Sequence, residues 1–226
     1  MSEAQQRTSR DSDTGSSGNG SRKALILDYG NVLAIGRSPT TVFKRQFDRS
    51  EQSRVHAIWG QQIRPEWRKL VRGQIRSVDF WKYVGKVYGV PVDIQKLEES
   101  CVTGIRINDS LMKMILAAKQ KGHAIAMLTN NVKEWFERMN GIADFSMFDI
   151  IVTSYETGMR KPENGIYAYT LDRLGMGAED CFFVDDGAMN VQAAQQLGIE
   201  GYVFDSWRLE HSNRELEERL REFGIL

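Results

Sequence analysis

The sequence is poor in cysteine and histidine, and the few that it has stand far apart. The two cysteines, Cys101 and Cys181, lie in apolar stretches without CxxC spacing, which excludes a disulfide framework and a thiolate zinc site. The three histidines, His56, His123 and His211, lack the partner spacing of a catalytic triad or a metal site. We therefore expect a reducing compartment, and structural or surface roles for the histidines.

The chain also lacks an excess of one charge and a long apolar run. Lys+Arg and Asp+Glu both number 30, whereas proteins that bind nucleic acids or anionic membranes carry a basic excess. No apolar segment approaches the roughly 20 residues that span a bilayer, and the N-terminus has no apolar signal core. We therefore expect no nucleic-acid partner, no membrane partner and a cytoplasmic location. The sequence does not indicate an oligomeric state.

The composition that is present is typical of a globular protein with one polar tail. Of the 226 residues, 41% are hydrophobic and 27% charged, which is enough for a sizeable core. Residues 1–22 have no large apolar side chain after Met1 and are rich in Ser, Gly, Asp and Thr, so we expect a disordered tail. Residues 39–107 have helical spacing throughout, with Ser77 and Asp93 as expected N-caps, and predict an all-helical insertion.

The rest of the chain alternates short apolar strands with helices. Strands are expected at 24–28, 123–129, 149–153, 181–185 and 201–204, and helices at 109–122, 132–139, 163–174 and 188–197, followed by an amphipathic C-terminal helix. This alternation predicts an α/β fold with a doubly wound, Rossmann-like parallel sheet. Residues 23–38 and 108–226 would form this core, interrupted after the first strand by the helical insertion.

Polar residues gather where the predicted strands end. Asp28, Thr129-Asn130-Asn131 and Asp185-Asp186 each follow or end a strand, and Lys161 precedes a helix. Each alone is ordinary, because Asp and Asn cap turns and helices and most lysines are solvated. In a parallel sheet, however, the carboxyl ends of the strands share one rim, where ligands bind. The coincidence of four such segments favours a functional site.

These residue types suit phosphoryl chemistry. Two carboxylates 4 Å apart repel by roughly 4 kcal/mol at an effective dielectric of about 20, so Asp28, Asp185 and Asp186 together favour a hard divalent cation such as Mg²⁺. Lys161 would neutralise a phosphoryl group, and Thr129, Asn130 and Asn131 would donate hydrogen bonds to it. Asp28 could then attack phosphorus and form an aspartyl-phosphate.

Four stretches, DYGNV, LTNN, RKPENGIY and VDDGAMN, occur in this order and resemble the motifs of the haloacid dehalogenase superfamily, most of whose members are Mg²⁺-dependent phosphatases. WRKLVRGQIRSVDFW in the insertion resembles the small helical cap of its phosphatase subgroup. Carried over by position, the resemblance implies that Asp28 is both the nucleophile and a metal ligand, and that the carbonyl of Gly30 is a second ligand. It implies that Asp186, with Asp185 beside it, completes the metal site. Thr129 and Asn130 would bind the phosphoryl oxygens, and Lys161 would neutralise them.

One position departs from this family pattern. Members usually carry an aspartate as general acid and base two residues after the nucleophile, where this chain has Gly30. General acid–base catalysis typically contributes about 10² to 10⁴ in rate. Sugar-phosphate phosphatases with a DxGNV motif, including those that resemble α-glucose-1-phosphate phosphatase, share the gap. We therefore expect a phosphatase of a small phosphorylated metabolite, with a sugar phosphate as one candidate.

Two alternatives stay open. A hydrolytic haloacid dehalogenase would displace halide without a metal, which the paired Asp185 and Asp186 disfavour. A catalytically silent protein that keeps this fold for binding would agree with the missing acid. In the cap, we expect only a few of the following residues to face the cleft: Trp59, Arg64, Trp67, Arg68, Arg72, Arg76, Trp81, Tyr83 and Tyr88.

Overall fold

The computed structural model describes residues 21–36, 39–100, 102–139 and 144–226. Most of the predicted disordered tail and Cys101 lie outside these ranges. Cys181 is buried. Within the described ranges, no helix combines the length and the apolar character that crossing a membrane requires.

A parallel sheet of five strands forms the centre of the fold, in the order β5-β4-β1-β6-β7. The strands are β1 (Ala24–Leu27), β4 (Ala124–Thr129), β5 (Ile150–Thr153), β6 (Cys181–Asp185) and β7 (Glu200–Val203). Every predicted strand is present with its ends shifted by at most one residue, and the predicted α/β class is confirmed. Because β1 is central, the segment that follows it is flanked by the ends of β4 and β6.

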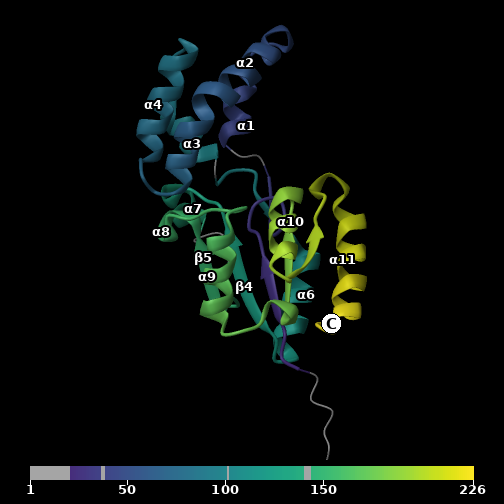
Figure 1. Cartoon of the computed structure of the whole chain (residues 1–226). Helices are drawn as coiled ribbons and strands as arrows, with labels where there is room; N and C mark the ends of the chain where they lie inside the picture. The colour runs from purple at the N-terminus through teal and green to yellow at the C-terminus, as the bar shows by residue number, and fades with distance from the viewer. Residues whose placement is uncertain (1–20, 37–38, 101, 140–143) are drawn as a thin grey trace, which may run out of the picture.

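Helices cover both faces of this sheet (Figure 1). Those that follow the insertion are α6 (Asp109–Gln120), α7 (Lys133–Met139), α8 (Ser154–Thr157), α9 (Asn164–Leu174), α10 (Ala188–Gln196) and α11 (Leu209–Phe223). Side chains of β1 alternate between the two faces, as a strand requires. Ala24 and Ile26 pack in the cluster that includes α9 and α10, and Leu25 and Leu27 in the one that includes α6 and α11.

A second group of helices lies over the carboxyl ends of the strands (Figure 1). It comprises α1 (Pro39–Lys44), α2 (Gln52–Ile58), a π-helical turn (Trp59–Ile63), α3 (Arg64–Val71), α4 (Ser77–Tyr88) and α5 (Ile94–Ser100). The chain enters this group after β2 (Ala34–Ile35) and leaves it through β3 (Arg106–Ile107), which pair antiparallel. The prediction of helix alone up to residue 107 is wrong at β3, because so short a strand forms only through its distant partner.

Of the two predicted N-caps in this group, one is confirmed. The Asp93 side chain accepts a hydrogen bond from the backbone N–H of Lys96, so it caps α5. The prediction for Ser77 is wrong, because α4 begins at Ser77 itself and its N-cap residue is Arg76. The backbone N–H of Ser77 donates instead to Glu134 of α7. A carboxylate from a distant segment thus replaces the local cap.

Gly201 offers a test of how α10 packs on the sheet. A Cβ at this position in β7 would lie 2.7 Å from Cγ1 of Val191 on α10, too close for either atom to stay in place. We expect Gly201→Ala to lower the stability by about 1–3 kcal/mol, and the Tm by about 2–4 °C for each kcal/mol. Gly60→Ala is the matched control, since the same added methyl meets nothing within 4 Å. A thermal melt that ranks the two variants the other way would contradict this packing.

Candidate functional site

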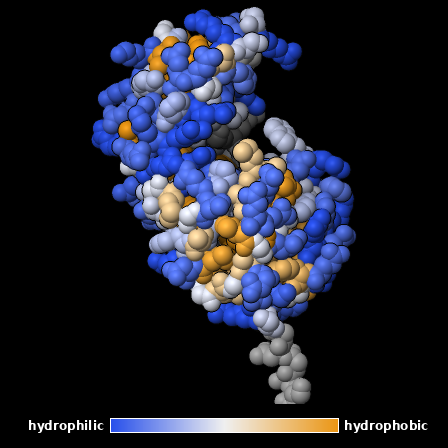
Figure 2. Space-filling view, in the orientation of Figure 1, coloured by the Kyte–Doolittle hydropathy of each residue, from blue (hydrophilic) through white to orange (hydrophobic). Residues whose placement is uncertain are grey.

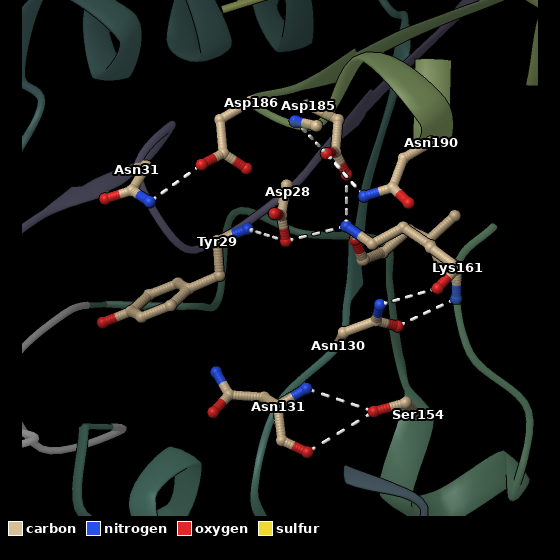
Figure 3. Close-up of polar contacts among 12 residues, drawn as sticks. Asp28, Tyr29, Asn31, Asn130, Asn131, Ser154, Lys161, Asp185, Asp186 and Asn190 are labelled. Atoms are coloured by element: carbon tan, nitrogen blue, oxygen red, sulfur yellow. Dashed lines mark hydrogen bonds and ion pairs between the residues drawn. The ribbon is translucent and has the colours of Figure 1, made fainter. Parts of the chain in front are cut away.

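Three neighbouring strands bring the candidate residues to one rim. Thr129 is the last residue of β4, Asp185 is the last of β6, and Asp28 directly follows β1 between them. Asp186 continues from β6, and Lys161 lies in the loop between α8 and α9. Figure 3 shows Asp28, Asp185, Asp186 and Lys161 turned toward a common centre.

Lys161 is almost completely buried, with 1% of its surface exposed. Its ammonium group lies 2.9 Å from Oδ1 of Asp28, 2.5 Å from Oδ2 of Asp185 and 2.7 Å from the carbonyl oxygen of Leu128. An ammonium has three hydrogens to donate, so these three acceptors satisfy it. Burial alone would lower the pKa of Lys161, but the carboxylates of Asp28 and Asp185 outweigh it and raise the pKa. The lysine is therefore a fixed positive charge.

Asp185 is fully buried, and donors surround its carboxylate. Oδ2 accepts from Lys161, while Oδ1 accepts from the backbone N–H of Gly187 and from the side-chain amide of Asn190, both at 2.8 Å. Asp185 is thus suited to hold Lys161 in position.

Asp28 is held through one of its two oxygens. Oδ1 accepts from the backbone N–H of Tyr29 at 2.7 Å as well as from Lys161. Burial raises the pKa of Asp28 to about 7; Lys161 opposes this rise, and Asp185 and Asp186 add to it. A cation beside this group would stabilise its charged form.

Asp186 is exposed, unlike Asp185, and its Oδ2 accepts a hydrogen bond from the Asn31 side chain at 2.8 Å. Burial of the carboxyl group itself, together with Asp185, raises the pKa of Asp186, and the Asn31 hydrogen bond opposes this. Asn31 has a left-handed backbone with φ of 58°, which asparagine tolerates better than most residues. The turn after β1 thus presents an amide to the carboxylate.

Asp28, Asp185 and Asp186 could hold a metal ion together. Each can offer an oxygen, and these oxygens lie within 4.8 Å of one another. With Lys161 counted, the group carries a charge of minus two when every member is ionised, which one divalent cation would balance. Oxygen donors of this type are those that Mg²⁺ prefers. The residues present therefore fit the ion.

The predicted phosphate-binding residues on β4 and after it differ in their contacts. The side chain of Asn130 accepts from the backbone N–H of Lys161 at 2.9 Å and donates to its carbonyl at 3.0 Å, so it positions the lysine. Asn131 donates its backbone N–H to Ser154 and its side chain accepts from Val132. In Figure 3, the backbone of Asn131 contacts Ser154, and its side chain points away from Ser154 and lies apart from Lys161. Thr129 is buried at the rim.

Gly30 leaves room where the family pattern has a carboxylic acid. A Cβ placed on Gly30 would meet no atom within 4 Å, and the residue is exposed. Its backbone does not have the positive φ that excludes other residues. The space for a larger side chain is therefore present, although this sequence does not fill it.

A cavity of about 180 Å³ opens beside Asp28. One part of its lining consists of residues at the strand ends, and the other part consists of apolar residues. Figure 2 shows a recess between the helical group and the rest of the molecule. Of the nine cap residues considered from the sequence, only Trp67 is among its described lining. Trp81 is instead completely buried, and Arg72 pairs with Glu163 and donates to the carbonyl of Gly158.

Sequence reasoning missed four contributors to this region. Asn31 donates a hydrogen bond to Asp186, and Asn190 donates one to Asp185. Ser154 accepts a hydrogen bond from the backbone of Asn131, and Trp135 lines the cavity. Asn31 and Asn190 do stand inside the motifs DYGNV and VDDGAMN, so their positions were a usable signal. Nothing in the local sequence marks Ser154 or Trp135.

Comparison with known proteins gives one family and several relatives. The family described as haloacid dehalogenase-like hydrolase matches residues 23–198. A drimenol cyclase of Aspergillus calidoustus is 27% identical over 205 residues, which cover 88% of this chain and 36% of that protein. The chain thus spans about a third of that relative's length. A sesquiterpene phosphatase of Aspergillus oryzae is 31% identical over 137 residues, covering 60% of this chain and 70% of that protein.

A solved structure shares the fold. A haloacid dehalogenase family enzyme from Bacteroides thetaiotaomicron, in complex with magnesium and inorganic phosphate, aligns with a TM-score of 0.64 and 21% identity. The alignment covers 82% of this chain and 95% of that chain. At this identity the likeness concerns the arrangement of the elements.

Proposed function

Because the chain belongs to the haloacid dehalogenase-like hydrolases, we propose that it is a Mg²⁺-dependent phosphatase that hydrolyses a small phosphorylated compound through an aspartyl-phosphate. The family match agrees with the four sequence motifs, whereas nothing in it singles out α-glucose-1-phosphate phosphatase. The observation that carries the proposal is the buried Lys161 that bridges Asp28 and Asp185 beside the exposed Asp186. A sesquiterpene phosphatase among the relatives supports the same reaction.

In the first step, Asp28 attacks phosphorus. Its Oδ1 is held by Lys161 and the Tyr29 N–H, so we assign the attack to Oδ2. The new bond from Oδ2 to phosphorus forms as the bond from phosphorus to the ester oxygen breaks, and the alcohol leaves with a proton from water. Water then attacks phosphorus of the aspartyl-phosphate, which releases inorganic phosphate and restores the carboxylate.

The surrounding residues hold the reactants. Thr129, the second side-chain N–H of Asn130 and the side-chain amide of Asn131 would donate to the phosphoryl oxygens, and Lys161 places a fixed positive charge beside Asp28. Asp28, Asp186 and the carbonyl of Gly30 would hold Mg²⁺, with Asp185 close behind. When bound, the ion would neutralise charge on the phosphoryl oxygens.

This arrangement also bears on the alternatives. A metal-free dehalogenase would gain nothing from an exposed carboxylate beside the nucleophile, whereas a metal-dependent phosphatase needs one there. A binding protein without catalysis would not need the charge of Lys161 placed on Asp28. The cytoplasmic location stays a prediction from the composition.

The nucleophile is tested by Asp28→Asn, which keeps the shape of the side chain and removes its nucleophilic oxygen. We expect phosphate release from an aryl phosphate to fall by more than about a hundredfold, with the fold retained by circular dichroism. Asp172→Asn is the control, since Asp172 is an exposed carboxylate on α9. Residual activity within tenfold of the wild type would rule Asp28 out as the nucleophile.

The metal is tested by activity and by stability together. We expect excess chelator to abolish turnover and Mg²⁺ to restore it. At 100 times its Kd, a ligand of the folded state stabilises by about 2.7 kcal/mol, which corresponds to a Tm rise of about 5–10 °C. Asp186→Asn should lose most of this rise and Asp172→Asn should keep it. Full activity in excess chelator would remove the metal from the proposal.

Because position 30 is a glycine and not an acid, we expect kcat/KM to depend strongly on the leaving group. Without an acid at this position, kcat/KM should fall as the pKa of the leaving alcohol rises, and a sugar 1-phosphate should react faster than the 6-phosphate of the same sugar. Because the site has room for a side chain, Gly30→Asp should raise the rate on alkyl esters by about 10²-fold, whereas Gly30→Asn, of equal size, should not. A flat dependence in the wild type, with chemistry rate-limiting, would show that another group delivers the proton.

A further inference from the structure

The cavity beside Asp28 has two chemically different parts. Its polar lining consists of residues at the carboxyl ends of the strands, from Asp28 to Asn31 and from Thr129 to Asn131. The remaining wall is mainly apolar, with Trp67, Ile105, Val132, Trp135 and Met139 as its larger side chains. Among the described lining residues, Asp28 has the only charged side chain.

The apolar wall offers few partners for hydroxyl groups. Trp67 and Trp135 lie with ring centroids 5.9 Å apart at an interplanar angle of 38°. The indole N–H of Trp135, the polar atom that this ring could offer, donates to Glu98 at 2.8 Å. A sugar placed against this wall would bury hydroxyls without partners, and each unpaired group costs about 1–3 kcal/mol. An alkyl or aryl group would gain by leaving water.

The wall also adjoins the phosphoryl end directly. Val132 follows Asn131 in the chain, and Trp135 and Met139 lie on α7, which begins one residue later. Gly36 and Ile105 also line the cavity, and Gly36 approaches the backbone of Ile105 so closely that a Cβ would lie 3.1 Å from it. A phosphoryl group at Asp28 therefore leaves its organic group facing the apolar wall. The face of the helical group that Figure 2 shows is mostly hydrophilic, in contrast to this apolar lining.

We propose that the substrate of this site is a phosphate monoester of an apolar alcohol, and that a polyhydroxylated sugar phosphate is a poor substrate. The inference rests on the proposed phosphatase function and adds the chemical class of the alcohol to it. The cavity wall formed by α3, α7 and the segment around Ile105 then determines specificity, while the strand ends provide the reaction.

The test uses primary-alcohol esters, so that the leaving group keeps nearly the same pKa. With Mg²⁺ present, kcat/KM is measured for methyl, butyl, hexyl and octyl phosphate, for glycerol 1-phosphate and for a sugar 6-phosphate. We expect kcat/KM to rise by about threefold to fourfold for each methylene that becomes buried, until the cavity is filled. The glycerol and sugar esters should fall at or below methyl phosphate.

A variant assigns the effect to this wall. Ile105→Asn should lower the octyl-to-methyl ratio of kcat/KM by about tenfold, because it places a polar group against the chain. Leu116→Asn is the matched control: Leu116 is 48% exposed on α6, outside the cavity lining, and the ratio should not change. Melting curves of both variants serve to check that they fold.

The outcomes separate the two proposals. Preference for the sugar or glycerol ester over the longer alkyl esters would overturn the apolar substrate class, while the phosphatase function would stand. An unchanged octyl-to-methyl ratio in Ile105→Asn would remove the wall as its cause. If no monoester is hydrolysed by the folded protein with Mg²⁺, aryl phosphates included, the phosphatase function itself fails, and the substrate class with it.

Discussion

The contact of Lys161 with two carboxylates is the interaction on which the site depends. A lysine with 1% exposure needs compensating charge and hydrogen bonds, because an unpaired buried charge costs several kcal/mol. Its three acceptors come from Leu128 on β4, Asp28 after β1 and Asp185 on β6. One ammonium group therefore joins the ends of the three central strands, and the sheet order β4-β1-β6 makes this possible.

Asp185, the last residue of β6, and Asp186, which follows it, differ in their surroundings. Asp185 is buried and accepts hydrogen bonds from Lys161, Gly187 and Asn190, so it is placed to hold the lysine. Asp186 is exposed and oriented by Asn31, which leaves it suited to a cation. A pair of identical residues in the sequence thus splits into a positioning group and a candidate ligand.

The candidate site consists of the polar residues at the strand ends and of the apolar wall of the cavity. The strand ends bring together Asp28, a fixed lysine and an acidic cluster, which in the proposed reaction act on the phosphoryl group. The wall that includes Trp67 and Met139 lies beside them, and in our proposal it contacts the organic group. Gly30 affects the departing oxygen, whereas the wall affects the rest of the alcohol. In the proposed enzyme, reaction and specificity therefore depend on different segments.

Local patterns in the sequence determined the strands, the main helices of the sheet and the residues that end the strands. Apolar runs bounded by Asp, Gly and Asn identify buried strands and their turns without knowledge of any partner. Asp28, Thr129 and Asp185 could be placed on one rim because parallel strands end at the same side.

The tertiary structure alone decided which side chains meet. The pairing of β2 with β3, the cap that Glu134 supplies to α4, the hold of Asn31 on Asp186 and the approach of Trp67 to Trp135 all join segments far apart in the chain. A local pattern carries no record of such contacts, since their free energy depends on the position of a distant partner.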